Sequence, residues 1–182
     1  MDYLQIGTTA AIAFIITVII TPLLIPLLKR IKAGQSIRED GPQTHMVKSG
    51  TPTMGGVAII VAVLITSLTA GDINTDMLII VTAFLFYAIL GFMDDFVKVS
   101  LKRNLGLTAK QKLILQILIA VGLACYQSRV SVYGTTVFIP IINEFVDFGI
   151  WYIPFIAFVV VAMVNSVNLT DGLDGLASGV TL

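Results

Sequence analysis

Long uncharged runs of apolar residues alternate with short polar segments along this chain, and this pattern predicts its architecture. Five runs come close to the roughly 17–25 residues that a helix needs to cross a bilayer. They lie at residues 3–28, 49–71, 77–93, 113–128 and 148–170, and a sixth run begins shortly before the last residue, Leu182. We therefore expect an all-α integral membrane protein, a polytopic helical bundle with five spans and the start of a sixth.

Two local signals add detail to this bundle. Pro22 and Pro26 lie late in the first run, where we expect a kink that neighbouring helices can tolerate. Between the fourth and fifth runs, β-branched and polar residues alternate on both sides of Tyr133-Gly134, which predicts a short extracytoplasmic β-hairpin. No repeat or second domain is evident, so residues 1–182 are expected to form a single transmembrane domain.

Composition and charge agree with a membrane location and predict its orientation. Hydrophobic residues make up 57% of the 182 residues and charged residues 12%, against about 45–50% and 25% in soluble domains. Of the eleven basic residues, only Arg129 lies outside the two loops that follow the first and third runs. The positive-inside rule then places segments 29–55, 94–112 and 168–176 in the cytoplasm and the N-terminus outside. A net charge of zero argues against a nucleic-acid partner.

Two adjacent acids, Asp94 and Asp95, follow the third apolar run. Charges at this depth are costly and seldom without a function. Neighbouring side chains on a helix point about 100° apart, so the two carboxylates are able to hold two different partners, such as a metal ion and a substrate oxygen. A salt bridge between Asp94 and Lys98, four residues later, is the alternative.

A second polar group, formed by Asn168, Asp171 and Asp174, ends the fifth run. Its three-residue spacing puts the side chains on one face of a helix, and it does not fit a calcium-binding loop. The predicted topology places both acidic groups on the cytoplasmic side, together with the loop KSGTPTMGG that begins at Lys48. Oxygen ligands suit Mg²⁺, and lysines with Gly-rich backbone suit phosphate. The combination indicates chemistry on a phosphorylated substrate at the membrane surface.

Four segments in this order carry a family resemblance: DGPQTHMVKSGTPTMGG, GFMDDFVKV, NLGLTAKQK and NSVNLTDGLDGLASG. Together they resemble the phospho-N-acetylmuramoyl-pentapeptide-transferases, a family within the polyprenyl-phosphate N-acetylhexosamine-1-phosphate transferase superfamily. The loop around Lys48 looks specific to this family. The resemblance implies a Mg²⁺-dependent enzyme of the bacterial inner membrane. Its reaction would move phospho-N-acetylmuramoyl-pentapeptide from UDP to undecaprenyl phosphate and give lipid I and UMP for peptidoglycan biosynthesis.

The resemblance also implies roles for individual residues. Asp94 and Asp95 match the catalytic acids, and the substrate-site residues are Lys48, Thr53, Lys98, Lys112, Asn168, Asp171 and Asp174. Asp94, Asp95 and Asp174 are expected to contact Mg²⁺, with the main ligand beyond Leu182. The family implies about ten helices and a homodimer at full length. Because the family is nearly twice as long as this chain, we expect residues 1–182 to be an N-terminal part that is inactive alone.

Three other functions and two mechanisms remain open at this point. A related transferase using a UDP-N-acetylhexosamine is the nearest alternative, and the loop around Lys48 argues against it. A cation transporter would carry its acids near the bilayer midplane, whereas these acids are predicted at helix ends. A purely structural membrane anchor would tolerate neutralisation of Asp94, Asp95 and Asp171. For the transferase, we expect direct attack by the lipid phosphate; a covalent aspartyl-phosphate intermediate is the alternative.

Overall fold

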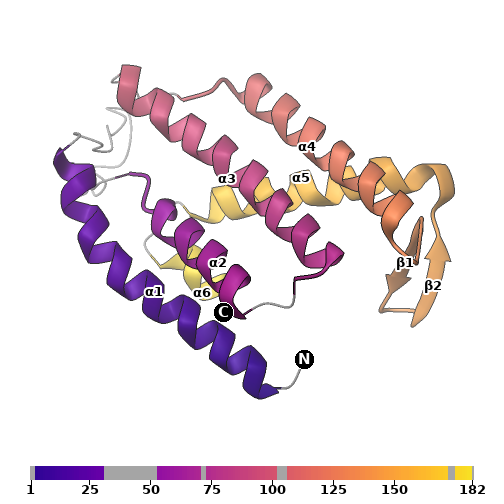
Figure 1. The fold of residues 1–182 in the computed structure, drawn as a ribbon. Coiled ribbons are helices and arrows are strands. Elements are labelled where there is room, and N and C mark those ends of the chain that lie inside the picture. Colours follow the sequence, from indigo (N-terminus) through magenta and orange to yellow (C-terminus); the bar gives the residue numbers. More distant parts are fainter. Residues whose placement is uncertain (1–2, 31–52, 71–72, 102–105, 172–174, 182) are drawn as a thin grey trace. The chain divides into compact units, whose positions relative to one another are not determined.

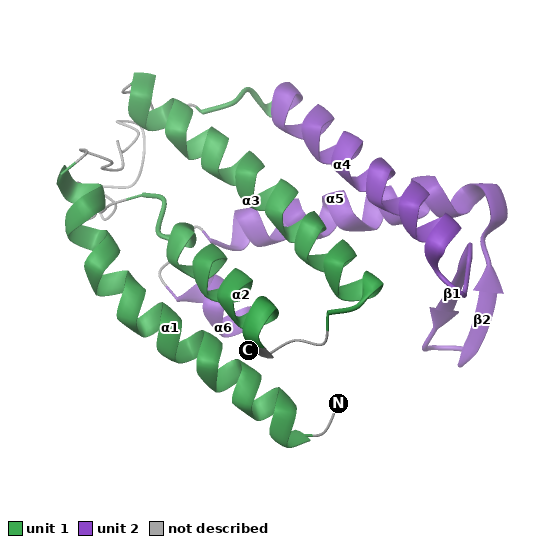
Figure 2. Ribbon diagram, viewed as in Figure 1, with its two compact units in different colours: residues 1–109 green, residues 110–182 purple. Residues whose placement is uncertain are grey.

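The computed structural model describes residues 3–30, 53–70, 73–101, 106–171 and 175–181. Apart from one small sheet, the regular elements in these ranges are helices (Figure 1). In chain order they are α1 (Tyr3–Arg30), α2 (Gly56–Ala70), α3 (Thr75–Leu101), α4 (Ala109–Val130), β1 (Thr136–Ile139), β2 (Glu144–Asp147), the short 3₁₀ helix η2 (Gly149–Trp151), α5 (Tyr152–Thr170) and α6 (Leu176–Thr181). The chain divides into two compact units, residues 1–109 and 110–182 (Figure 2).

Among the described residues, four helical segments are long and apolar enough to cross a membrane: α1, α3, α4 and the segment Gly149–Thr170, which includes η2 and α5. The prediction of a polytopic helical membrane protein is therefore confirmed. The second predicted span, 49–71, differs from expectation, because α2 begins only at Gly56 and has 15 residues. At about 1.5 Å per residue it is roughly 22 Å long, shorter than the roughly 30 Å of bilayer hydrocarbon. α6 lies in the predicted sixth run.

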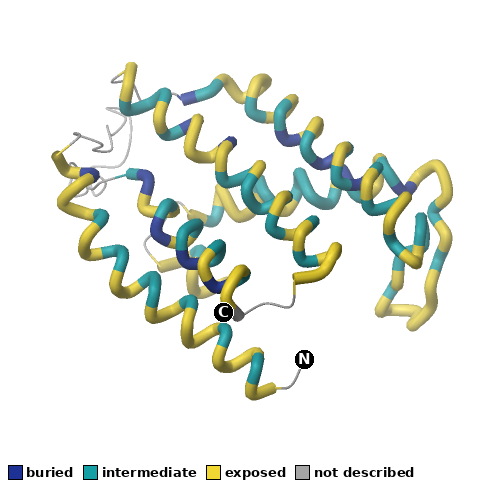
Figure 3. The backbone as a smooth tube through the Cα atoms, viewed as in Figure 1, coloured by how far each residue is buried: buried dark blue, intermediate teal, exposed yellow. Residues whose placement is uncertain are grey.

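Small side chains form the contact face of α2 in the first unit. α2 contacts α1 and α3, and its buried residues Ala58, Ala62 and Thr66 recur at every fourth position. Small residues at this spacing let membrane helices approach closely. Elsewhere in the described helices, exposed positions outnumber buried ones (Figure 3). Many of the exposed side chains are large and apolar, as expected of helices whose surroundings are lipid rather than water.

An apolar cluster joins the ends of three helices in the first unit. Its buried members are Leu28 of α1 and Met54, which precedes α2, and Val99 of α3 packs against them. Met54 has a φ of 70°, a left-handed conformation that is strained for a residue with a side chain. The buried Met54 side chain offsets this strain by packing in the cluster. The cluster therefore fixes the segment before α2 against the end of α3.

The two long helices of the second unit, α4 and α5, run in opposite directions. Residues Gln116, Ala120 and Ala124 recur at every fourth position of α4 and are buried. Asn165 of α5 donates a hydrogen bond of 2.8 Å from Nδ2 to Gln116 Oε1. The β1–β2 hairpin connects the two helices. The second unit therefore presents the start of α4 and the end of α5 on the same side.

The predicted hairpin is confirmed, but its turn lies elsewhere in the sequence. β1 and β2 are antiparallel, with Val137 opposite Val146, so the turn occupies residues 140–143 rather than Tyr133-Gly134. Pro140 lacks the N–H that a strand ladder needs, which ends β1, and Asn143 adopts a left-handed φ of 55°, which asparagine tolerates.

Gly134 instead belongs to the turn that follows α4, with a φ of 57°. Its N–H donates to the carbonyl oxygen of Ser131 over 3.0 Å. The alternation of β-branched and polar residues on both sides of Gly134 is therefore divided between this turn and β1, and only the downstream half forms a strand.

One prediction concerns Asp147 at the base of this hairpin. The Thr135 hydroxyl, and secondly the Gly149 N–H, donate to its Oδ1, and these bonds lower the pKa of the Asp147 carboxyl below its ordinary value. The carboxylate therefore stabilises the hairpin above the unfolded-state pKa, and this contribution is lost as the pH falls through the lower folded pKa. Thr135→Val should raise the pKa of Asp147, measured by carboxyl ¹³C NMR titration in micelles. Glu144→Gln is the control on the same strand, and an unchanged Asp147 titration in Thr135→Val would contradict this account.

Candidate active site

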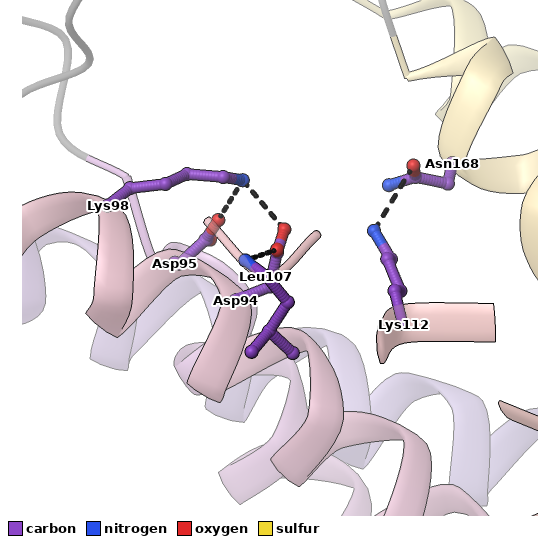
Figure 4. A network of polar contacts seen from close by, with 6 residues as sticks. All are labelled: Asp94, Asp95, Lys98, Leu107, Lys112 and Asn168. Atoms are coloured by element: carbon purple, nitrogen blue, oxygen red, sulfur yellow. Dashed lines mark hydrogen bonds and ion pairs between the residues drawn. The ribbon is translucent and has the colours of Figure 1, made fainter. Parts of the chain in front are cut away.

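Asp94 and Asp95 share one cation on the surface of α3. Lys98 Nζ lies 2.8 Å from Asp94 Oδ2 and 2.9 Å from Asp95 Oδ1 (Figure 4). The salt bridge weighed as the alternative is thus present, and the two carboxylates meet a common partner instead of two separate ones. The reason is that α3 continues to Leu101, so the flexible lysine side chain, one turn beyond the acids, reaches both. The acids therefore lie about two turns before the helix end, not at it.

Asp94 is also held by the chain segment that follows α3. Asp94 is 8% exposed, and its Oδ1 accepts a hydrogen bond of 2.9 Å from the Leu107 N–H. Gly106 lies directly against it, since a Cβ at this position would overlap the Asp94 carbonyl oxygen and Oδ1. Sequence reasoning did not single out Gly106 or Leu107. Both lie in the segment NLGLTAKQK, where a glycine ahead of a helix start was the available signal.

The apolar cluster brings part of the Gly-rich loop to this end of α3. Thr53 directly precedes Met54, whose side chain packs with Val99, the residue after Lys98. The N–H groups of Val57 and Ala58 donate to the carbonyl oxygens of Met54 and Gly55, both over 3.1 Å, and begin α2. Thr53 therefore lies next to the cluster that contains Val99, four residues after Asp95. Lys48 lies outside the described residues.

The second unit gathers its own candidate residues where α4 begins and α5 ends. Lys112 Nζ lies 3.5 Å from Asn168 Oδ1 (Figure 4). Asp171 terminates α5, and its N–H donates to the Val167 carbonyl oxygen over 3.1 Å. Asn168 and Asp171 are both exposed, so this part of the predicted polar face is present. Asp174 lies outside the described residues.

The acids of the first unit suit a metal ion that is shared with a substrate. Within the described ranges, no group of three or more His, Cys, Asp and Glu side chains is placed to hold a metal. However, Asp94 and Asp95 each direct one oxygen toward the same positive group, the Lys98 ammonium. Mg²⁺ is usually held by one or two carboxylates, with water and substrate phosphates completing its shell. The donor set therefore fits Mg²⁺ bound together with a phosphorylated ligand.

Comparison with protein families identifies the family to which the chain belongs. Residues 77–182 match the model of glycosyl transferase family 4, a stretch that contains Asp94, Asp95, Lys98 and the polar end of α5. The chain belongs to glycosyl transferase family 4. Residues 48–60 match a second, shorter pattern, phospho-N-acetylmuramoyl-pentapeptide-transferase signature 1, which covers Lys48, Thr53 and the start of α2.

Curated relatives resemble the chain over nearly its whole length. A phospho-N-acetylmuramoyl-pentapeptide-transferase of Alkaliphilus metalliredigens is 59% identical over 100% of this chain and 58% of its own length. The enzyme of the same name from Clostridioides difficile is 52% identical over 98% of this chain and 55% of its own length. This family 4 chain therefore spans a little over half the length of the curated relatives it matches.

The close approach of Gly106 to Asp94 predicts an unusual sensitivity at position 106. Gly106→Ala places a methyl group where the Asp94 backbone and carboxylate lie, and overpacking of this kind costs about 1–3 kcal/mol. We expect a lower unfolding temperature in detergent for this family 4 protein. The control is Gly91→Ala, because nothing lies within 4 Å of a Cβ at Gly91. Equal unfolding temperatures for the two variants would contradict the close packing of Gly106 on Asp94.

Proposed function

We propose that the complete protein carrying this sequence transfers phospho-N-acetylmuramoyl-pentapeptide from UDP to undecaprenyl phosphate. The products are lipid I and UMP, and the reaction is a step of peptidoglycan biosynthesis. The observation that carries the proposal is the match of residues 48–60 to the signature of enzymes with this name. The Asp94–Asp95 pair supports the proposal, because two neighbouring carboxylates that converge on one positive group, here the Lys98 ammonium, suit phosphoryl chemistry.

Asp94 and Asp95 would hold Mg²⁺ in this enzyme, with Asp174 as a further candidate. When bound, the ion would offset the negative charge of the donor pyrophosphate. The two acids differ in their suitability for contact with the reactants. The Asp94 side chain is 11% exposed and that of Asp95 33%, and Asp94 is already bonded to Leu107. Asp95 is therefore the better candidate to meet the substrate, and Asp94 the better candidate to fix the geometry.

The reaction needs positioning and charge neutralisation more than a general base. A phosphate monoester has a second pKa near 6, so the lipid phosphate is largely dianionic at neutral pH. One of its oxygens bonds to the phosphorus that carries the sugar, the bond from this phosphorus to the bridging pyrophosphate oxygen breaks, and UMP leaves. We favour this direct attack, with Asp95 orienting the lipid phosphate.

The other candidate residues would bind the two substrates. Basic side chains suit the charged pyrophosphate, and the polar end of α5 suits the uncharged and sugar parts of the donor. The basic group is Lys48, Lys98 and Lys112, and the polar group is Thr53, Asn168, Asp171 and Asp174.

The distribution of basic residues supports a cytoplasmic site in the bacterial inner membrane. Lys98 and Lys112 lie near the ends of α3 and α4 that would face the cytoplasm, whereas the β1–β2 hairpin connects the opposite ends of α4 and α5. The positive-inside rule then places the N-terminus and the hairpin outside. The full-length enzyme is proposed to be a homodimer, as the family resemblance implies.

A comparison of two donors tests the proposed function. The complete purified protein is given undecaprenyl phosphate, Mg²⁺ and either UDP-N-acetylmuramoyl-pentapeptide or a UDP-N-acetylhexosamine, and UMP release is measured. We expect release with the muramoyl-pentapeptide donor alone, and its loss when EDTA removes the metal. Turnover of the UDP-N-acetylhexosamine donor alone would instead assign the protein to the sister reaction.

Neutralising one acid should separate a catalytic carboxylate from an interfacial charge. Asp95→Asn keeps the side-chain shape and removes the charge that would contact metal and phosphate. We expect kcat and kcat/KM to fall together by about a hundredfold or more. Asp76→Asn is a matched control, since Asp76 lies in the first turn of the same helix. Turnover of Asp95→Asn within a few fold of the parent would remove Asp95 from the site.

The proposed orientation predicts which positions a membrane-impermeant thiol reagent reaches. Lys110 and Ile141 are both exposed and lie at opposite ends of α4 and its hairpin. Lys110→Cys should be labelled only from the cytoplasmic side, and Ile141→Cys only from the outside of intact cells. The reverse pattern would show that the candidate site faces outward.

A further inference from the structure

One pair of polar side chains, Gln116 of α4 and Asn165 of α5, joins the two helices by a hydrogen bond. Gln116 is 1% exposed. Its Oε1 accepts the Asn165 Nδ2–H over 2.8 Å, and the same nitrogen donates to the Val161 carbonyl oxygen of its own helix, also over 2.8 Å. Burial of an amide costs free energy unless it is hydrogen-bonded. Neither residue belongs to the candidate active site, so the burial of Gln116 and its bond to Asn165 need another explanation.

The buried pair lies one turn deeper than a pair of candidate substrate residues. Lys112 precedes Gln116 by four residues, and Asn168 follows Asn165 by three. Because α4 and α5 run in opposite directions, Lys112 and Asn168 lie on the same helix contact, closer to its end. Their separation of 3.5 Å is the outer limit of a hydrogen bond, and the contact is exposed to solvent. The outer contact is therefore too weak to align the helices by itself.

Apolar packing alone does not select one alignment here. Ala120 and Ala124 continue the buried face of α4 at four-residue intervals. Positions one turn apart on this face of α4, about 5.4 Å along the helix, carry equally small side chains and therefore do not distinguish one alignment from the next. A hydrogen bond between the buried Gln116 amide and the partly buried Asn165 amide is satisfied in one alignment only, and buried polar residues set helix register in this way in coiled coils. The Gln116–Asn165 bond thus supplies the selectivity that the alanines lack.

We propose that Gln116 and Asn165 are positioning residues for the donor substrate, an inference that rests on the proposed transferase function. Their hydrogen bond fixes the register of α4 against α5, so that the Lys112 ammonium and the Asn168 amide face each other. This arrangement holds the Lys112 ammonium and the Asn168 amide side by side, where both are able to bind a nucleotide-linked diphosphate. Neither Gln116 nor Asn165 touches the substrate.

A cross-linking experiment measures the register without relying on activity. Lys112→Cys and Asn168→Cys are introduced together into the complete protein after its other cysteines have been replaced, and a short thiol cross-linker is applied in membranes. Gln116→Met removes the hydrogen bond at nearly constant volume, and we expect it to lower the cross-linked yield about threefold or more. Asn165→Leu removes the same bond from the other helix and should give the same result. Gln127→Met, farther along α4, should leave the yield unchanged.

An exchanged pair distinguishes loss of register from loss of folding. The double variant Gln116→Asn with Asn165→Gln keeps both amides and their combined length, and it should restore the cross-linked yield. If the yield is unaffected by both Gln116→Met and Asn165→Leu, the register does not depend on this bond and the proposal is wrong. If the parent protein releases no UMP from the donor, the proposed function fails, while the cross-linking still decides the register.

Steady-state kinetics then test whether the α4–α5 register affects donor binding, in variants that keep Lys112 and Asn168. Gln116→Met should raise the KM for UDP-N-acetylmuramoyl-pentapeptide about tenfold and change kcat less, because binding contacts are displaced while the reacting groups are not. The exchanged pair should return KM toward the parent value. A lower cross-linked yield with an unchanged KM would overturn the positioning role.

Discussion

A buried carboxylate on an apolar helix needs a cation or a hydrogen-bond donor within reach, because lipid offers neither. In the first unit this requirement applies to Asp94. One oxygen meets Lys98 and the other meets the Leu107 N–H. The first contact requires α3 to remain helical for at least one turn beyond the acid. The second requires the chain after α3 to return to the helix surface, where only the absence of a side chain at Gly106 leaves room. The length of α3, the path after it and the glycine thus all depend on one buried charge.

The two units solve the same problem with different groups. The first unit uses the ion pairs of Lys98 with Asp94 and with a second acid, Asp95. Two carboxylates beside one ammonium group leave a net negative charge, which is suited to metal binding. The second uses neutral amides, Gln116 and Asn165, which align α4 with α5. In both, small side chains form much of the remaining buried helix contact. Each unit thereby holds its polar side chains in defined pairs.

The sequence predicted the features that depend on local composition. Apolar runs located the helices, and the four-residue spacing of Asp94 and Lys98 indicated their salt bridge. The predicted ends of the helices and strands were less accurate, because contacts in the folded chain, rather than local composition, determine where an element begins and ends. α3 continues past its apolar run to place Lys98 against two acids, α2 begins late after the left-handed Met54, and the hairpin turn lies after Pro140.

The contacts that sequence reasoning missed join residues far apart in the chain. Asp94 and Leu107 are 13 positions apart, and Gln116 and Asn165 are 49. Each member of these pairs is ordinary in its own surroundings: a leucine before a helix, a glutamine in an apolar run. Only the folded chain shows that they meet, and no periodic pattern in the sequence marks them.

The Asp94–Asp95 pair is proposed to be a cation site that serves phosphate chemistry. Binding of Mn²⁺, a paramagnetic substitute for Mg²⁺, to the complete protein in the presence of UDP-N-acetylmuramoyl-pentapeptide tests it most directly by electron paramagnetic resonance. The account predicts a bound Mn²⁺ signal that is lost when both acids are changed to asparagine and is retained in Asp76→Asn. An unchanged bound signal in the Asp94→Asn and Asp95→Asn double variant would contradict the claim.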